Sequence, residues 1–356
     1  MKILHIIDSL AIGGAEMLLC NFIKQYNREQ PDSRHFIITL NQDLSLLPVI
    51  KEHIEGNVVI KFSKARALKS IIELKKAIKK QSPDIIHSHL FYSTMLARLA
   101  AGKIPVVSTY HNMEYCKESP NYSGNYIFLD KLTFSKKRNY SIYVSNAVKT
   151  CVQKGVPAQI GHAVTIPNFV TNEFSYQYNY NDNKELRLVA VGNLKKVKNH
   201  LFALKEIASL NHPGITLDIY GEGNLHDDLA EFIGRHALKV RLMGKTIITS
   251  MLLCEYDAFL LPSLSEGMPV SLIEAIVSGL PSLVSDLPQL QETAGNSALY
   301  FSPANTGSLA SLLKEVYNNK KQLINLSCEA RLLAGKYSWQ NYFGSVEDVY
   351  QQVLGS

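Results

Sequence analysis

The chain has 356 residues, of which 46% are hydrophobic and 19% are charged, with a net charge of +6. This ordinary globular composition can form large cores, and the length suggests about two domains of roughly 100–200 residues each. No apolar run reaches the ~18 residues of a membrane span, and the short apolar N-terminus lacks a signal-peptide cleavage site, so neither a membrane span nor a signal peptide is expected.

Strands and helices alternate through the first half of the chain, which predicts a parallel sheet covered on both faces. Short apolar runs give the expected strands, at residues 2–7, 35–40, 58–60, 84–87, 105–110, 141–144 and 163–166. Helical patterns lie between them. The first runs through Phe22 and Ile23 after a turn at residues 13–16, and the others lie near residues 45–55, 64–80, 90–101, 121–137 and 145–154.

The alternation begins again after residues 171–185, which lack periodicity, are rich in Asn, Tyr and Asp, and are predicted to be a linker. The expected strands of this half are residues 186–191, 215–220, 240–242, 258–261, 282–284 and 298–301. We therefore predict α/β architecture with two doubly wound, Rossmann-like domains, residues 1–170 and 186–337, facing each other across a ligand-binding cleft.

Charge is divided unevenly between the halves. Residues 1–170 hold 22 basic and 12 acidic side chains, whereas the remainder holds 15 and 19. Much of the basic excess lies on the polar face of the amphipathic segment 64–80. Two interpretations stay open: a solvated helix face, or contact with anionic lipid headgroups, to which Lys136, Lys137 and Arg138 would contribute.

The five cysteines are scattered: Cys20, Cys116, Cys151, Cys254 and Cys328. Their odd number and the absence of any Cys-x-x-Cys predict reduced thiols in a cytoplasmic protein, without a disulfide framework or a zinc site.

The most informative stretch is Pro262 to Pro281, which follows an expected buried strand and enters a helix. It carries two carboxylates, Glu266 in the loop and Glu274 in the helix. A carboxylate can accept hydrogen bonds from two adjacent hydroxyls, such as those of a ribose, and helix-start amides can face a phosphate. The alternative is that Glu266 is solvated and Glu274 is only a helix residue favoured by the dipole.

The whole string, Glu266-Gly-x-Pro with Glu274-Ala and then Gly279-x-Pro, resembles the nucleotide-sugar loop of the family-4 retaining glycosyltransferases of GT-B fold, as found in bacterial surface-polysaccharide synthesis. The resemblance implies donor contacts from Glu266, Gly267, Met268, Pro269, Val270 and Glu274. It also implies that residues 1–170 receive the acceptor, that 186–337 hold the donor, and that a helix from 338 to 356 crosses back to the first domain.

A second loop, from Val191 to His200, follows a strand and opens a helix, an arrangement that suits phosphate. The family carries Gly-Arg-x-x-x-x-Lys here, which assigns Gly192 and Lys198 to the diphosphate. Asn193 stands where arginine is common, so the diphosphate would depend more on Lys198, with Lys195 or Lys196 as helpers. A polar turn with solvated lysines is the simpler alternative.

Two further positions resemble family contacts to the nucleotide. Gly221 lies in the turn that lines the nucleotide pocket, and Met243 lies where main-chain atoms meet the base. Because these contacts are mostly main-chain, the sequence does not choose between bases, and a UDP- or GDP-linked sugar is expected.

In the first half, Gly13 and Gly14 resemble the family's glycine loop, whose backbone approaches the donor phosphate or the acceptor. Glu16 is interpreted as a residue that stabilises the helix start. His111 resembles the strand-end histidine beside the reacting sugar carbon. His87 and His89 are expected only to line the cleft.

We therefore predict a hexosyltransferase-type enzyme that moves a sugar, with retention, from a nucleotide-diphosphate sugar to a glycan or lipid-linked acceptor in polysaccharide synthesis. His111, Lys198 and Glu266 are the expected catalytic residues, and no cofactor is expected. No Asp-x-Asp occurs, so no metal is expected on the diphosphate. Nucleic acid is not an expected partner, and the expected location is the cytoplasm, with peripheral attachment to the inner face of the plasma membrane.

Other functions are less well matched. No dinucleotide-binding or P-loop signature is present. A nucleotide-sugar epimerase of the same architecture and a non-catalytic sugar-binding protein remain the competing hypotheses, which nucleotide release with and without acceptor would separate.

Overall fold

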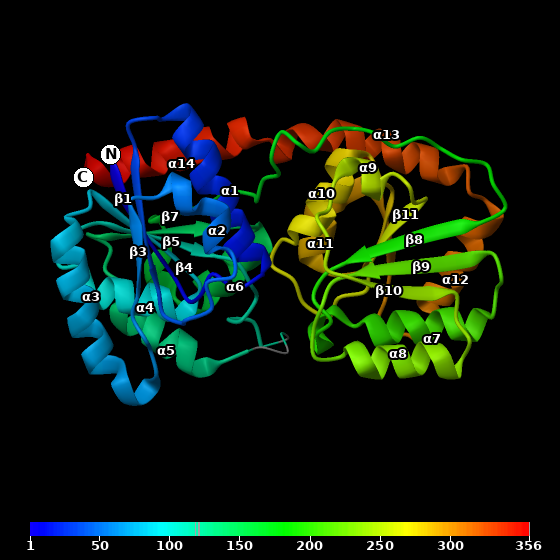
Figure 1. The fold of residues 1–356 in the computed structure, drawn as a ribbon, viewed down its shortest axis with the longest axis horizontal. Coiled ribbons are helices and arrows are strands. Elements are labelled where there is room, and N and C mark those ends of the chain that lie inside the picture. Colours follow the sequence, from blue (N-terminus) through cyan, green and yellow to red (C-terminus); the bar gives the residue numbers. More distant parts are fainter. Residues whose placement is uncertain (118, 120–121, 356) are drawn as a thin grey trace. The chain divides into compact units, whose positions relative to one another are not determined.

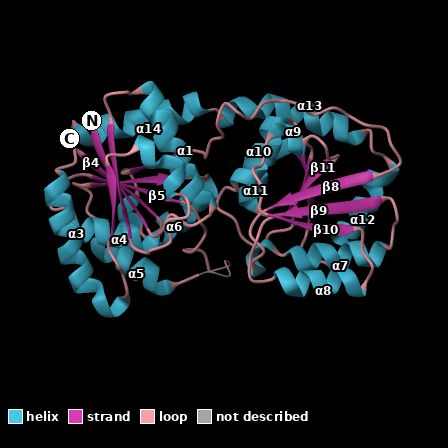
Figure 2. Ribbon diagram, viewed as in Figure 1, coloured by secondary structure: helices cyan, strands magenta, loops and turns pink. Residues whose placement is uncertain are grey.

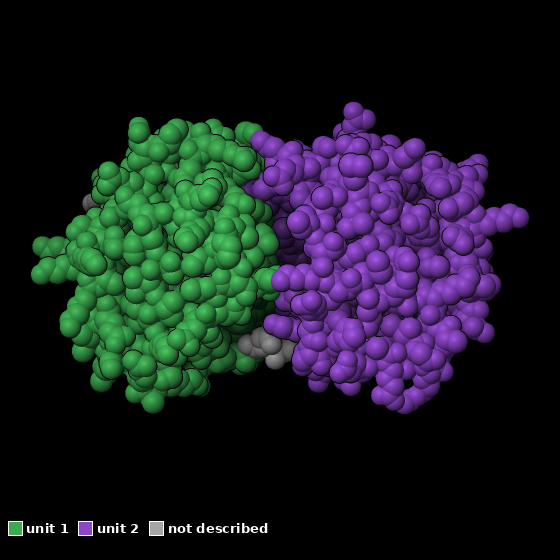
Figure 3. Space-filling model, in the orientation of Figure 1, with its two compact units in different colours: residues 1–168, 339–356 green, residues 169–338 purple. Residues whose placement is uncertain are grey.

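In this computed structural model, residues 1–117, 119 and 122–355 are described, and the chain divides into two compact units (Figure 3). Unit 1 comprises Met1–Asn168 and Trp339–Ser356, and unit 2 comprises Phe169–Ser338. Among the described residues, no helix is both long and apolar enough to cross a membrane.

Unit 1 is built on a seven-stranded parallel sheet with the order β3-β2-β1-β4-β5-β6-β7 (Figures 1 and 2). Its strands are β1 (Lys2–Ile7), β2 (Arg34–Thr39), β3 (Gly56–Val59), β4 (Ile85–His89), β5 (Val106–Tyr110), β6 (Asn139–Tyr143) and β7 (Ala163–Thr165). Its α-helices are α1 (Gly14–Glu29), α2 (Leu47–Ile50), α3 (Ala67–Gln81), α4 (Phe91–Ala100), α5 (Gly124–Thr133), α6 (Asn146–Gly155) and α14 (Trp339–Leu354).

Side chains that alternate along the strands separate two faces of this sheet. Leu4 and Ile6 of β1 belong to an apolar core with residues of α3 and α4. His5 points to the opposite face, where its ring contacts Phe22 of α1. Helix α14 joins the same layer, because Tyr350 hydrogen-bonds His87 on that face. The C-terminal helix is therefore part of unit 1 (Figure 1, red).

Two expected helices are shorter than predicted. Residues 45–55 form only the four-residue α2 and a 3-10 turn, Lys51–His53, because the chain extends at Ile54 to pair Gly56 with Phe36. The helix expected at 121–137 is α5, which ends at Thr133; position 121 lies outside the described residues.

Unit 2 contains a six-stranded parallel sheet with the order β10-β9-β8-β11-β12-β13. Its strands are β8 (Leu186–Val191), β9 (Ile215–Tyr220), β10 (Val240–Gly244), β11 (Ala258–Leu261), β12 (Ser282–Ser285) and β13 (Ala298–Phe301). Its α-helices are α7 (His200–Leu210), α8 (His226–Arg235), α9 (Ser250–Leu253), α10 (Val270–Ser278), α11 (Pro288–Ala294), α12 (Ser308–Asn318) and α13 (Gln322–Ala334).

Residues 171–185, expected as a linker, form no helix or strand but pack against unit 2. The Tyr176 hydroxyl lies 2.9 Å from Ser327 Oγ, and Lys320 donates to Asn183 at 2.7 Å. Lys320 also pairs with the buried Asp257 at 2.8 Å. Lys320 thus links the C-terminal end of this segment to a buried carboxylate of unit 2.

Candidate active site

Each sheet has one point where the chain order reverses. In unit 2 the chain runs outward from β8 through β9 to β10, and then resumes on the other side of β8 with β11. The loops that follow β8 and β11 therefore diverge at the carboxyl end of the sheet, where doubly wound proteins bind ligands. Unit 1 has the equivalent reversal between β1 and β4.

The loop after β8 is held against the loop after β9 by main-chain hydrogen bonds. Gly192 donates to Tyr220 at 2.9 Å, and Leu194 donates to Glu222 at 2.9 Å. The Leu194 side chain is fully buried, so it anchors the loop. Lys198 then ends a 3-10 turn and is half-buried, whereas Lys195 and Lys196 are exposed.

Gly221 is required by this close packing. Its φ is +148°, and an added Cβ would lie 2.0 Å from the carbonyl oxygen of Gly192. Its amide donates to Gly244 at the end of β10, at 2.8 Å. Gly192, Gly221 and the exposed Met243 of β10 thus lie at the ends of three adjacent strands.

Lys198 and Glu266 are brought together from loops 68 residues apart. Lys198 Nζ donates to Glu266 Oε1 at 2.7 Å, and Ser263 Oγ donates to the same oxygen at 2.6 Å. Their side chains are 20% and 11% exposed, so solvent screens the pair only partly. The amide of Leu264 donates to Val197, which ties the two loops together.

The sequence assigned Lys198 to phosphate and Glu266 to sugar without predicting that they contact each other. The pair holds a cation and a carboxylate in fixed positions, with Glu266 Oε2 receiving no hydrogen bond among the described contacts. Gly267, Met268 and Pro269 are buried and shape the loop through packing.

Helix α10 begins directly after this loop, with Pro269 at its N-cap. The amides of Val270 and Ser271 have no intrahelical acceptor because they lie in the first turn, and they give the helix end a partial positive charge. Glu274 follows one turn later and is half-buried. Burial raises the pKa of Glu274 to about 7, and no described residue pairs with its carboxyl group.

In unit 1, Asp8 lies at the reversal point but was not predicted from the sequence as a site residue. Asp8, directly after β1, accepts hydrogen bonds from the amide and hydroxyl of Ser93 at 2.9 and 2.5 Å. Leu90, which precedes α4, has a φ of +69°, a conformation that costs a leucine roughly 1–3 kcal/mol. The position of Asp8 after an apolar strand is a signal that could have identified it.

Gly13 is the N-cap of α1, and Gly14 begins that helix. An added Cβ on Gly13 would lie 2.3 Å from Glu16 Oε2, so the Glu16 carboxylate lies over the helix start. This position agrees with the interpretation of Glu16 as a residue that stabilises the helix end.

His111 follows β5 and is half-buried, and its Nε2 lies 3.3 Å from Nδ1 of His89. The prediction that His87 and His89 line a cleft is wrong, because their side chains are only 1% and 4% exposed. Period-two alternation along β4 turns both rings toward the layer that contains α1 and α14, where they stack at 4.3 Å.

Burial keeps this histidine group neutral. It lowers the pKa of His111 to about 4 and that of His87 to about 3, and it holds the pKa values of His5 and His89 well below the ordinary value. A neutral imidazole can donate from one nitrogen and accept at the other, so each ring can link two partners.

One set of metal-ligating groups emerges among the described residues: His5, His87 and His89, whose candidate ligand atoms lie within 4.8 Å of one another. However, both nitrogens of His87 are already hydrogen-bonded, to Tyr350 at 2.6 Å and to Thr109 at 2.8 Å. A metal would have to displace one of them. The set therefore serves as a hydrogen-bonded part of the core.

Glu114 is a second carboxyl group that sequence reasoning missed. Burial raises its pKa to about 7, and the nearby carboxylate of Asp8 contributes to this shift. Asn112 donates to Glu114 Oε1 at 2.9 Å. The loop after β5 thus brings a histidine and a protonatable carboxyl group to the carboxyl end of the sheet.

A buried polar network anchors this loop. Asp130 of α5 accepts hydrogen bonds from the hydroxyls of Tyr110 and Tyr115, each at 2.6 Å, and pairs with Arg98 at 2.6 Å. Because Tyr110 and Tyr115 flank His111 on both sides in sequence, the network restrains the segment that carries it.

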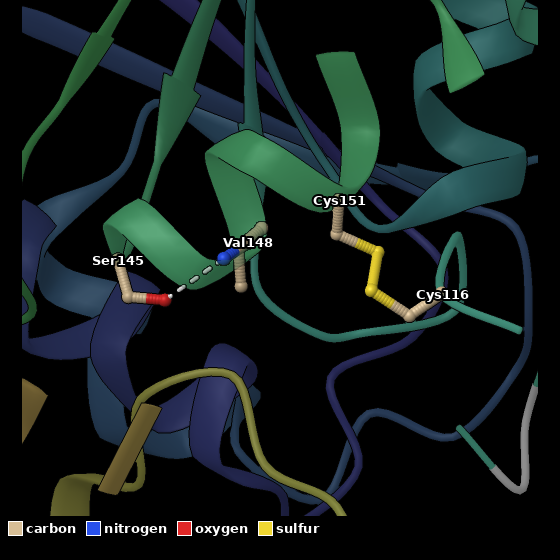
Figure 4. Close-up of a disulfide and its surroundings, with 4 residues drawn as sticks. All are labelled: Cys116, Ser145, Val148 and Cys151. Atoms are coloured by element: carbon tan, nitrogen blue, oxygen red, sulfur yellow. Dashed lines mark hydrogen bonds between the residues drawn. A yellow bond between two sulfur atoms is a disulfide. The ribbon is translucent and has the colours of Figure 1, made fainter. Parts of the chain in front are cut away.

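A disulfide gives a further restraint and corrects the sequence prediction. Cys116 and Cys151 are bonded, with Cα atoms 5.4 Å apart (Figure 4). They are separated by 35 residues, but β5 and β6 are neighbours, so the loop after one reaches the helix after the other. Sequence spacing alone does not show this proximity. Cys20, Cys254 and Cys328 are free.

The comparisons with known proteins agree with this architecture. Solved structures with the same fold include HepE of Anabaena in complex with UDP and glucose, at a TM-score of 0.81 and 17% identity, over 98% of this chain and 99% of HepE. That likeness shows the fold, and it confirms the predicted fold class, α/β with two Rossmann-like domains of the GT-B type.

Sequence matches then define the family. Residues 12–174 match the model described as Glycosyltransferase Family 4, and residues 185–319 match Glycosyl transferases group 1. The chain belongs to the family-4 glycosyltransferases. It is a sugar-transferring enzyme of the hexosyltransferase type in polysaccharide or glycan synthesis, and the epimerase and sugar-binding alternatives are not supported.

Two bacterial proteins are similar to this chain in sequence. EpsF of Bacillus subtilis (strain 168) is 26% identical over 316 residues, covering 80% of this chain and 79% of EpsF. The UDP-Gal:alpha-D-GlcNAc-diphosphoundecaprenol alpha-1,3-galactosyltransferase of Escherichia coli is 32% identical over 241 residues, covering 62% of each chain.

Proposed function

We propose that unit 2 binds a UDP-linked hexose and that the sugar is transferred, with retention, to a glycan or lipid-linked acceptor bound by unit 1. The observation that carries this proposal is the fixed Lys198–Glu266 pair at the reversal point of the unit 2 sheet, beside the start of α10. A cation, a carboxylate and free helix-start amides are what a sugar diphosphate requires.

Each donor residue then has a role. Lys198 and the first amides of α10 stabilise the charge that develops on the departing diphosphate. Glu274 accepts the ribose hydroxyls, and Glu266 accepts hydroxyls of the transferred sugar. Gly192 and Asn193 allow the backbone to approach the phosphates, and the main chain near Gly221 and Met243 meets the base.

The acceptor would be bound at Gly13 and Gly14 of unit 1, and His111 would contact the sugar that is transferred. Attack by its hydroxyl on the face from which the diphosphate departs would retain the configuration of the sugar. Because Lys198 and helix amides provide the positive charge, the proposed transfer needs no metal on the diphosphate. Activity in excess chelator tests this point, and a loss that only Mg²⁺ or Mn²⁺ restores would refute it.

UDP is favoured over GDP because two similar proteins are associated with it: HepE was solved in complex with UDP and glucose, and the E. coli relative is named for UDP-Gal. Titration calorimetry with UDP, GDP and ADP measures the preference directly. Tighter binding of GDP than of UDP would contradict this part of the proposal.

Glu266→Gln separates the sugar contact from the nucleotide contact. The variant should bind free UDP nearly as the wild type does, but it should bind the correct UDP-sugar more weakly and transfer it more slowly. Equal losses for both ligands would show that Glu266 does not contact the sugar. Exposed Glu255→Gln provides a matched control.

We also propose that unit 1 contacts the cytoplasmic face of the membrane, where a lipid-linked acceptor would be found. Exposed apolar side chains lie beside lysines on two helices, Leu68 and Ile72 on α3 and Phe128 and Leu132 on α5. Anionic lipids, enriched in the cytoplasmic leaflet, attract such basic surfaces by about 1 kcal/mol per residue.

Sedimentation with vesicles tests this contact. Binding should require anionic lipid, weaken at 1 M salt, and fall when Lys75, Lys76, Lys79 and Lys80 are replaced by Gln. Equal binding to neutral vesicles would show that the basic face of α3 is only a solvated surface.

A further inference from the structure

The contact between His89 and His111 defines which nitrogen of His111 is free. His111 Nε2 faces His89 Nδ1 at 3.3 Å, and the two rings are nearly parallel with centroids 5.6 Å apart. Because Nε2 is engaged, the nitrogen of His111 that remains for a ligand is Nδ1, which has no described protein partner.

His89 is itself held in place from its other side. Its ring stacks on His87 at 4.3 Å, and His87 is fixed by Thr109 at 2.8 Å and by Tyr350 of α14 at 2.6 Å. The His89 ring therefore has little freedom to rotate, and its Nδ1 stays directed at His111.

The proton on His89 can be located from its surroundings. Its other nitrogen, Nε2, is buried and has no hydrogen-bond partner. A neutral imidazole has one N–H, and a buried N–H without an acceptor is rarer and more costly than a buried lone pair. The proton therefore lies on Nδ1, which donates to Nε2 of His111.

We propose that His89 is a positioning residue that fixes His111 as the tautomer protonated at Nδ1. In this form His111 presents an N–H donor, so it recognises an oxygen of the sugar, a hydroxyl or the ring oxygen, and it does not act as a general base. This inference deepens the proposed function, because it rests on His111 contacting the sugar.

Nitrogen NMR of the protein labelled with ¹⁵N-histidine tests the tautomer without any measurement of activity. The signals of His111 are assigned by their loss in His111→Gln. We expect a protonated Nδ1 and an unprotonated Nε2 for His111. The reverse tautomer, or a charged ring at pH 7, would overturn the proposal. Neither result would contradict the residues that the proposed function assigns to the donor.

Variants of His89 then test whether this residue controls the tautomer of His111. His89→Asn keeps an N–H donor near the position of Nδ1, whereas His89→Leu removes it. We expect His89→Leu to lower kcat about tenfold and to mix the His111 tautomers, whereas His89→Asn should preserve both properties better. Equal loss in the two variants, with the tautomer unchanged, would overturn the proposal.

His35→Asn is the matched control, because His35 is a buried histidine of the same sheet that bonds His5 and not His111. If the NMR result is as expected but His111→Gln transfers sugar normally, then the role of His111 in the proposed function fails while the assignment of His89 stands.

Discussion

The two sheets have the same doubly wound order around their reversal points but present opposite chemistry there. In unit 1, burial leaves neutral imidazoles and a carboxyl group, Glu114, whose pKa is raised to about 7. In unit 2, the loops after β8 and β11 hold a charged pair, Lys198 and Glu266, at 2.7 Å. The strand order therefore determines where each site lies, whereas the residues around that site determine whether it is charged.

This difference separates two tasks. A departing diphosphate requires fixed positive charge, which the unit 2 loops provide. A sugar bound through its hydroxyls requires directional donors and acceptors, which neutral side chains supply without the desolvation cost of a buried ion. The charged site of unit 2, the disulfide that restrains unit 1, and Glu274, a unit 2 carboxyl group whose pKa is raised like that of Glu114, can each be tested separately.

The largest expected effect is that of Lys198→Ala. Charge grows on the diphosphate as the sugar leaves, so loss of the nearby cation should lower kcat, by on the order of 10²–10³. Because no arginine accompanies it, we expect the upper part of that range. Steady-state transfer, or donor hydrolysis, measures the loss.

Lys195→Ala and Lys196→Ala are the matched controls, since both lysines are exposed and lie in the same loop. They should retain nearly full activity. If Lys198→Ala keeps more than about a tenth of the wild-type kcat, a loss below 1.4 kcal/mol, the diphosphate is bound by other groups.

The disulfide of unit 1 should contribute to stability by restraining the unfolded chain. For a separation of 35 residues, Cys116→Ser is expected to lower the free energy of unfolding by about 2–4 kcal/mol. Calorimetry should show a lower transition temperature for unit 1 and an unchanged one for unit 2. Cys328→Ser, at an exposed free thiol, is the control, and equal transitions in both variants would exclude a stabilising disulfide.

The sequence predicted helices and strands correctly where the hydrophobic pattern alone determines them. The strands at residues 2–7 and 186–191 have their predicted bounds, because buried parallel strands are short apolar runs between turns. The helix expected at 45–55 failed because the pairing of Gly56 with Phe36 overrides local propensity.

The contacts within the site could not be predicted in the same way. The bond between Lys198 and Glu266 spans 68 residues, and the contact of His89 with His111 depends on which strands are neighbours. The scattered cysteines gave a wrong prediction for the same reason. Spacing along the chain does not report the strand order that brings such residues together.

A tenfold effect of pH is expected for nucleotide binding. With a pKa of about 7, Glu274 is mostly neutral at pH 6, and a neutral carboxyl group is a poor acceptor for two ribose hydroxyls. UDP affinity should therefore rise with pH and be about tenfold weaker at pH 6 than on its plateau above pH 8.

Glu274→Gln should remove this pH step and bind UDP more weakly at pH 8. Titration of the UDP phosphate affects both proteins equally, so the difference between them isolates Glu274. The raised pKa also means that Glu274 makes unit 2 less stable as pH rises from about 4.5 to 7, and no further above that range. Identical pH profiles in the two proteins would exclude Glu274 as the ribose acceptor.

The smallest expected effect is that of Asn193→Arg. Asn193 is half-buried in the loop that carries Lys198, at the position where the family commonly has arginine. The added guanidinium can engage a diphosphate with two parallel hydrogen bonds, so the variant should change kcat by less than about threefold in the wild-type background. In the Lys198→Ala background the same change should restore part of the lost kcat, since it returns a positive charge to the leaving group. Asn193→Gln, which adds length without charge, should restore none. Rescue by Gln, or no rescue by Arg, would show that this side chain does not reach the diphosphate.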